Sequence, residues 1–140
     1  MPARILIVDD EPEIGRILAV ILRGAGFEVA AVDGGRAALE HLAASATDLV
    51  LLDVTMPELD GFETLRRIRE APATARLPVL MLTAHAGAAD RARAESLGAD
   101  PTVVVACPLP GGTREAAGWV KQLRERAAAV LRAPVPAGRR

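Results

Sequence analysis

The chain has 140 residues, which predicts one domain with a single core, because compact domains usually contain about 100–150 residues. Its composition, 51% hydrophobic and 25% charged, excludes an intrinsically disordered protein, and its single cysteine excludes a disulfide framework or a cysteine zinc site. With 17 Lys and Arg against 18 Asp and Glu, and only one Trp and two Phe, the chain lacks the basic charge and stacking aromatics of a nucleic-acid-binding protein.

The chain begins with a predicted strand and helix. Residues 5–8 form a continuous apolar run, which is typical of a strand that is covered on both faces in a parallel sheet. Pro12 is expected to open a helix and Gly24 to end it, because these residue types favour the two ends of helices. Apolar residues at spacings of three and four predict the face that meets the core: Ile14, Ile17, Leu18, Ile21 and Leu22.

The same alternation continues through the middle of the chain. Residues 28–32 and 48–53 are predicted strands. Asp33 is expected to cap a helix over residues 35–44, and Asp60 to cap the helix that begins at Gly61. The inner faces of these two helices are expected to carry Ala38, Leu39 and Leu42 in the first, and Phe62, Leu65 and Ile68 in the second.

Two further units complete the pattern, with strands over residues 79–83 and 102–106 and helices near 88–97 and 113–131. Five strands that alternate with five helices predict an α/β domain whose parallel sheet has right-handed crossovers. We therefore expect residues 1–132 to form the domain. Residues 133–140, which include two prolines and a glycine, are expected to be a loose tail or a linker stub.

Polar residues stand where three of the predicted strands end: Asp9 and Asp10 follow the first, Asp53 ends the third, and Thr83 ends the fourth. Ligands of parallel α/β sheets bind beyond the carboxyl ends of the strands, so these side chains are expected to converge. Crowded carboxylates with no histidine or thiolate favour Mg²⁺. One carboxylate is then free to attack phosphorus, and the Thr83 hydroxyl to donate to the phosphoryl oxygens. The alternative is that these are unrelated strand-end residues.

Four segments in order and spacing resemble the receiver domain of two-component response regulators: ILIVDDEP at 5–12, DLVLLDVTMPELDG at 48–61, PVLMLTA at 78–84 and SLGAD at 96–100. The resemblance covers about residues 3–108, and the last helix completes the domain. It implies a flavodoxin-like (βα)5 three-layer sandwich with a five-stranded parallel sheet in the order 2-1-3-4-5.

The resemblance also implies residue roles. Asp53 corresponds to the phosphoacceptor, which takes a phosphoryl group from a sensor histidine kinase or a phosphotransfer domain. Asp10 would bind Mg²⁺ directly and Asp9 through water, while Asp53 and the backbone carbonyl of Thr55 would be further ligands.

Three more positions correspond to family positions with known tasks. Thr83 would hydrogen-bond the phosphoryl group and shift on activation. Thr55 and His85 occupy the two variable positions that tune dephosphorylation, although for His85 a plain exposed loop histidine is the favoured interpretation. His41, on the second predicted helix, is expected to be a surface residue.

The chain departs from the family at the end of the fifth predicted strand. Receivers carry a lysine before a cis proline there, and Cys107 stands in its place before Pro108, whose peptide bond is expected to be cis. Val104 occupies the position of the aromatic switch residue, and the only lysine, Lys121, lies in the last helix. We expect weaker coupling between the site and the output face. Cys107 is interpreted as a small buried strand-end residue, with a redox or acylation site as the alternative.

The expected function is a phosphorylation-controlled signalling switch, with no enzymatic activity beyond phosphotransfer onto its own aspartate. The alternative is a pseudo-receiver scaffold that binds partners without phosphorylation. An output protein is expected to bind the face formed by the fourth helix, fifth strand and fifth helix. A homodimer is a further expectation. No apolar run approaches the roughly 18 residues of a membrane span, and no signal segment opens the chain, so we expect a cytoplasmic location without membrane or nucleic-acid contacts.

Overall fold

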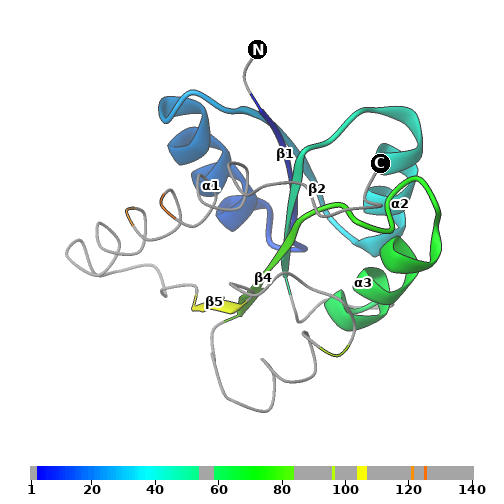
Figure 1. Cartoon of the computed structure of the whole chain (residues 1–140). Coiled ribbons are helices and arrows are strands. Elements are labelled where there is room, and N and C mark those ends of the chain that lie inside the picture. The colour runs from blue at the N-terminus through cyan, green and yellow to red at the C-terminus, as the bar shows by residue number, and fades with distance from the viewer. Residues whose placement is uncertain are drawn as a thin grey trace.

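A computed structural model of the chain describes residues 3–53, 59–83, 96, 104–106, 121 and 125. Its centre is a five-stranded parallel sheet in the order β2-β1-β3-β4-β5 (Figure 1). The strands are β1 (Arg4–Val8), β2 (Glu28–Val32), β3 (Leu49–Asp53), β4 (Val79–Thr83) and β5 (Val104–Ala106). The predicted fold class and strand order are therefore confirmed. Compared with the predictions, β1 begins one residue earlier and β3 one residue later, and residues 102 and 103 of the predicted last strand lie outside the described part of the chain.

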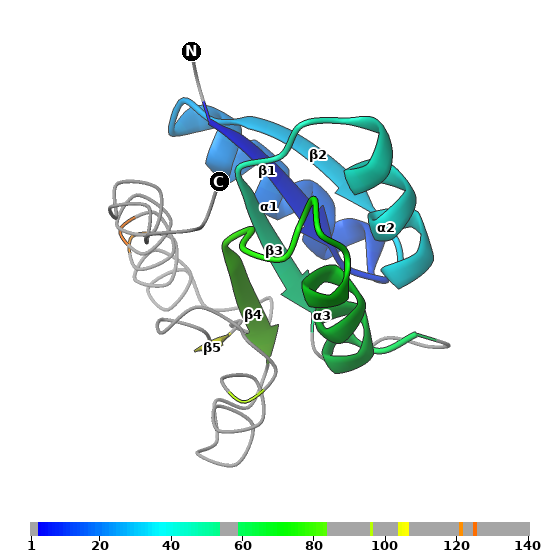
Figure 2. The same ribbon diagram turned by 45° about the vertical axis from the view of Figure 1, so that its right-hand side comes forward.

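Helices cover both faces of this sheet. They are α1 (Pro12–Gly24), α2 (Gly35–Ala44) and α3 (Gly61–Glu70). Figures 1 and 2 show α1 on one face and α2 and α3 on the other, which gives three layers. Ser96, Lys121 and Glu125 are helical too, in agreement with the last two predicted helices, whose other residues lie outside the described part of the chain. None of the helices built from described residues is long and apolar enough to cross a bilayer.

The strands are apolar throughout because both faces of the sheet are covered. Along β1, Leu6 and Val8 belong to a core cluster shared with α2 and α3, while Ile5 and Ile7 belong to a second cluster shared with α1. Burying a large apolar side chain stabilises a fold by roughly 1.5–3 kcal/mol. The two clusters therefore fix the strands relative to one another, and this fixes the positions of the residues at the carboxyl edge of the sheet.

The predicted inner face of α1 is correct except at Ile17. Leu18 and Leu22 are buried as expected, but Ile17 is 54% exposed. The buried face of the helix consists of Gly15, Leu18, Ala19 and Leu22. Since successive residues are about 100° apart around a helix, Ile17 lies nearly opposite this face. The inner faces predicted for α2 and α3 are confirmed.

Of the two predicted N-caps, one is confirmed and one is wrong. The Asp60 carboxylate accepts a hydrogen bond from the backbone N–H of Glu63 at 2.8 Å, and this fixes the start of α3. Asp33 does not cap α2, because the N-cap position falls one residue later, on Gly34, which has no side chain to accept a bond.

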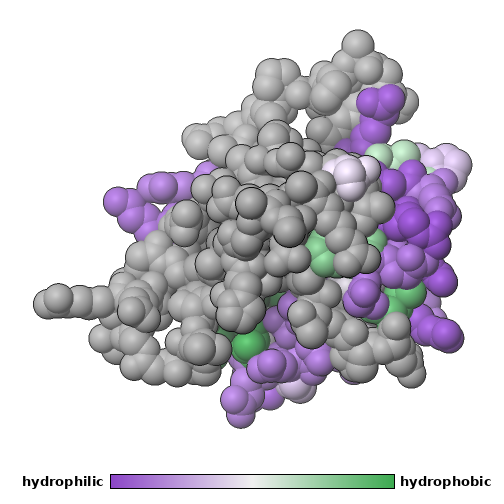
Figure 3. Space-filling model, turned by 90° about the horizontal axis from the view of Figure 1, so that it is seen from below, coloured by the Kyte–Doolittle hydropathy of each residue, from purple (hydrophilic) through white to green (hydrophobic). Residues whose placement is uncertain are grey.

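The surface of the described residues on the α2–α3 side is largely hydrophilic, as Figure 3 shows from below. On α3, Arg66 pairs with Glu63 and Glu70, and Arg67 pairs with Glu63 at 3.3 Å. The hydrogen bond from Arg66 is the main reason that the pKa of Glu63 is lowered to about 2. Arg66, Arg67 and Glu70 are exposed and Glu63 is half-buried, so water and salt screen these charges, and we assign them to a solvated helix face.

Gly35 permits the close approach of α2 to α3. A Cβ at this buried position would lie 2.3 Å from Thr64 Oγ1 and 2.9 Å from Leu59 Cδ2. Thr64 is fully buried, and its hydroxyl donates to the backbone carbonyl of Asp60 at 2.8 Å, so it cannot move aside without losing a bond.

We therefore expect Gly35→Ala to lower the free energy of unfolding by about 1–3 kcal/mol, as measured by urea denaturation. Gly24→Ala is the matched control, because a Cβ at Gly24 meets nothing within 4 Å, and its stability should stay within about 0.5 kcal/mol of the wild type. Equal stabilities of the two variants would contradict this account of the α2–α3 contact.

Candidate metal centre

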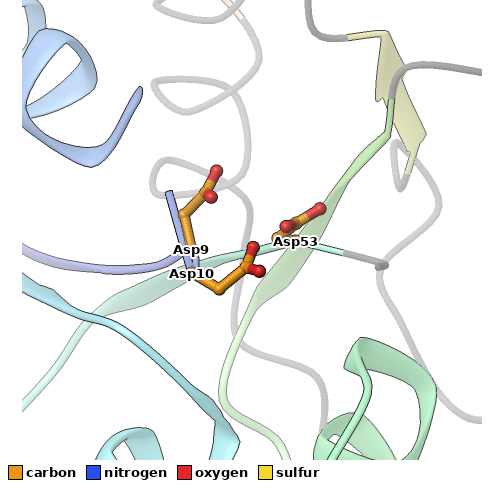
Figure 4. A group of neighbouring side chains, drawn as sticks. All are labelled: Asp9, Asp10 and Asp53. Atoms are coloured by element: carbon orange, nitrogen blue, oxygen red, sulfur yellow. The ribbon is translucent and has the colours of Figure 1, made fainter. Parts of the chain in front are cut away.

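Three carboxylates meet at the carboxyl edge of the sheet. Asp9 and Asp10 directly follow β1, and Asp53 is the last residue of β3. These strands are parallel neighbours with Val8 beside Leu52, so their ends lie side by side. One oxygen of each carboxylate lies within 4.8 Å of the others (Figure 4). The predicted convergence of the three acids is present in the structure.

Thr83 is placed at the same edge by the register of β4. Leu82 is the partner of Asp53, so Thr83 stands one residue further along the adjacent strand. Ala106 pairs with Thr83, which brings the end of β5 to this edge as well. Val104, at the start of β5, pairs with Met81. Four of the predicted site residues lie outside the described part of the chain: Thr55, His85, Cys107 and Pro108.

Asp9 is the least accessible of the three acids, with 7% of its surface exposed. Burial raises the pKa of its carboxyl group, and the negative charges of Asp10 and Glu11 raise it further. A hydrogen bond from the backbone N–H of Glu11, at 2.9 Å, opposes these effects and orients the carboxylate. The ionised cluster is therefore electrostatically unfavourable unless a cation offsets its charge.

Sequence reasoning missed the contribution of the Glu11 backbone. An aspartate that accepts a hydrogen bond from the N–H two residues further on forms an Asx-turn, and such turns are frequent just before helices. The signal was available in the order Asp9, Asp10, Glu11, Pro12, because Pro12 marks the first turn of the helix. The turn aims the Asp9 side chain, and it depends on a main-chain group that any residue at position 11 except proline would supply.

The donor set fits Mg²⁺. Asp9, Asp10 and Asp53 offer only carboxylate oxygens, and Mg²⁺ prefers hard oxygen ligands from one or two carboxylates while keeping several waters. Within the described residues, no imidazole or thiol joins this group, so the chemistry that selects zinc or copper is missing from it. These three residues would therefore hold the ion.

The raised pKa of Asp9 leads to a prediction about stability and pH. A carboxyl group whose pKa is raised on folding binds its proton more tightly in the native state. This tighter proton binding stabilises the folded protein fully at pH values below 3.8, the ordinary pKa of the group. The stabilisation is lost as the pH rises through the higher pKa that the group has in the folded protein. In Mg²⁺-free buffer, Asp9→Asn should therefore be more stable than the wild type at pH 7, and this difference in the free energy of unfolding should shrink as the pH becomes acidic.

Urea denaturation at several pH values, with EDTA or with Mg²⁺, measures this effect. Added Mg²⁺ should stabilise the wild type and have a much smaller effect on Asp9→Asn, because only a bound ligand stabilises the native state. A variant that is less stable than the wild type in EDTA at pH 7 would contradict the predicted charge crowding.

Comparison with known proteins agrees with this geometry. Residues 5–105 match the family described as the response regulator receiver domain. The chain is 39% identical over 126 residues to the transcriptional regulatory protein CpxR homolog of Haemophilus influenzae, which is 90% of this chain and 52% of that protein. It is 41% identical over 103 residues to the regulatory protein VanRc of Enterococcus gallinarum, which is 74% of this chain and 43% of that protein. The chain thus spans about half the length of these relatives.

Solved structures show the same architecture. A putative response regulator from Chloroflexus aurantiacus superposes with a TM-score of 0.82 at 31% identity, covering 95% of this chain and 100% of the other. The receiver domain of the sensor histidine kinase PA1611 from Pseudomonas aeruginosa superposes with a TM-score of 0.79 at 26% identity, with the same coverages. That domain was solved with a magnesium ion coordinated in its active-site cleft.

Proposed function

The chain belongs to the receiver-domain family of response regulators, and on that basis we propose that it accepts a phosphoryl group on Asp53 in a Mg²⁺-dependent reaction. The observation that carries the proposal is the meeting of Asp9, Asp10 and Asp53, whose carboxylate oxygens lie within 4.8 Å of one another. The receiver domain is proposed to comprise residues 1–132, followed by a tail at 133–140.

The proposed chemistry is a single phosphoryl transfer. A carboxylate oxygen of Asp53 attacks the phosphorus of a phosphohistidine, an O–P bond forms, and the N–P bond breaks with its electron pair remaining on the histidine nitrogen. Asp9, Asp10 and Asp53 would hold Mg²⁺, with the Thr55 carbonyl as a further ligand. The ion would offset the negative charge of the phosphoryl oxygens. The Thr83 hydroxyl donates a hydrogen bond to the transferred group, and Thr55 and His85 set how fast water removes it.

We propose that this site is weakly coupled to the rest of the domain. Cys107 replaces the lysine that makes a charge-assisted contact with the phosphoryl group, and Val104 replaces the aromatic switch residue. A shift of Thr83 on phosphorylation would then not be followed by an inward movement of an aromatic side chain at position 104. The output partner is proposed to bind the fourth helix, β5 and the fifth helix, as a separate protein or a second copy of the chain.

The phosphodonor protein is proposed to dock on the exposed side of α1. Ile17 and Val20 are 54% and 65% exposed there, on a helix that begins two residues after Asp10. Exposed apolar side chains beside a charged site are typical of a protein-binding surface. Ile17→Asp should slow transfer from a phosphorylated phosphotransfer domain, while phosphorylation by acetyl phosphate stays unchanged. Ala43→Asp, on the exposed surface of α2, is the control. Equal slowing with both donors would contradict docking at α1.

Binding of beryllofluoride in the presence of Mg²⁺, followed through amide chemical shifts, tests the proposed function. Shifts that stay near Asp9, Asp10 and Asp53 are the expected result and indicate a receiver whose site is decoupled. Shifts that extend to the fifth helix would show a working switch and contradict the weak coupling. An absence of binding would overturn phosphoryl acceptance and support the second candidate, a pseudo-receiver scaffold, which the replacement of the lysine by Cys107 favours.

A further inference from the structure

Among the strands that the structure describes, β2 forms one edge of the sheet, and β1 is its neighbour. The backbone N–H of Glu28 donates to the Ala3 carbonyl at 3.0 Å, and the Val32 carbonyl accepts from the Asp9 N–H at 3.1 Å. Backbone groups of successive strand residues point to opposite sides, so Glu28, Ala30 and Val32 face β1. The N–H and C=O groups of Val29 and Ala31 consequently point away from the sheet.

The Arg23 side chain forms a hydrogen bond with one of these outward-pointing backbone groups. Its Nη2 donates to the Val29 carbonyl at 2.9 Å, from the last turn of α1. The tight connection from α1 to β2, in which Gly26 has a φ of 98°, returns the chain so that residue 23 reaches residue 29. The guanidinium thus places both a donor and a positive charge on the edge of β2.

The strand itself carries no feature that discourages pairing. Its sequence, EVAAV, contains neither lysine nor proline, and only Glu28 is charged. Open edges of this kind pair readily with another strand, and natural proteins block them with charges or with covering segments. Glu28 stands at the start of β2 and is already paired with Arg4 at 3.1 Å.

We propose that Arg23 covers the open edge of the sheet and prevents two copies of this chain from pairing through β2. A second copy is the natural occupant, because antiparallel pairing about Ala30 would set Val29 of each copy opposite Ala31 of the other. Arg23 takes the Val29 acceptor that this pairing needs in both copies. It also brings two like charges to the same edge, which further disfavours the pairing.

Sedimentation equilibrium of the full chain over a range of concentrations tests this role. Arg23→Ala is expected to self-associate at least about tenfold more tightly than the wild type, because two backbone acceptors become available. Arg23→Ser, which adds no apolar surface and is too short to replace the bond from Arg23 to the Val29 carbonyl, should associate as Arg23→Ala does. Arg16→Ala, at an exposed position of the same helix, should match the wild type. Far-UV circular dichroism verifies that each variant is folded.

The double variant Arg23→Ala/Ala31→Lys decides whether any association uses the β2 edge. Ala31 is exposed, so a lysine there restores a positive charge to the edge without filling the core. Return of the double variant to the wild-type association constant supports the proposal. Unchanged association in Arg23→Ala and Arg23→Ser overturns it, and so does association that persists in the double variant.

Discussion

Asp53→Asn is expected to reduce the acyl phosphate formed with acetyl phosphate and Mg²⁺ to the background of an untreated sample. Asparagine has nearly the shape of aspartate, so the sheet edge is kept, but its amide is no nucleophile toward phosphorus. The loss should occur without loss of stability. Phosphorylation is measured by intact mass and by the hydroxylamine lability of the product.

Asp33→Asn is the matched control for this experiment. Asp33 directly follows β2 and is an exposed carboxylate, yet it is not one of the three acids whose oxygens come together. Its replacement should leave the yield of acyl phosphate unchanged. Equal yields from Asp53→Asn and the wild type would show that Asp53 is not the acceptor.

Cys107→Lys is expected to raise the rate of phosphorylation by acetyl phosphate and the affinity for beryllofluoride by about 10- to 100-fold. A hydrogen bond to a charged group contributes about 1.5–3 kcal/mol, which corresponds to this range. The position is suitable because residue 107 directly follows β5, and Ala106 pairs with Thr83 at the sheet edge where Asp53 ends β3. The added positive charge should at the same time weaken Mg²⁺ binding in the absence of a phosphoryl group.

Cys107→Met separates the charge from the length of the side chain. It extends the side chain without an ammonium group, and it should therefore give no gain in rate and no loss of Mg²⁺ affinity. If Cys107→Lys and Cys107→Met behave alike, the missing lysine does not limit the chemistry of this site.

Much of the fold was predictable because local signals agreed with the tertiary structure. The predicted bounds of β2, α2 and β4 coincide with those observed, since each apolar run is flanked by glycine, proline or polar residues. The start of α1 at Pro12 and the start of α3 after Asp60 were predicted from the capping preferences of those residues.

The errors arose where several patterns overlapped. On α1, Ile14, Ile17, Val20 and Ile21 allow more than one apolar stripe at helical spacing, and only packing against the sheet selects the face centred on Leu18 and Leu22. For α2, the choice between Asp33 and Gly34 as N-cap depends on the backbone path out of β2, which propensity does not determine.

The acidic cluster was predictable for a topological reason, since the carboxyl ends of parallel strands share one edge of a sheet. The near-complete burial of Asp9 and its bond to the Glu11 N–H were not predictable, because they depend on the turn geometry between β1 and α1. Thr83 was likewise predictable at this edge from the end of the fourth strand, whereas the roles of Thr55 and Cys107 come from the family resemblance.

Locating the phosphoryl group is the most direct test of the central claim. The full chain is incubated with acetyl phosphate in Mg²⁺ or in EDTA, reduced with borohydride to trap the acyl phosphate, and mapped by peptide mass spectrometry. The predicted result is modification of the peptide that contains Asp53, at that residue, in Mg²⁺ only. Modification that is independent of Mg²⁺, that occurs at another residue, or that is absent in both conditions would contradict the account.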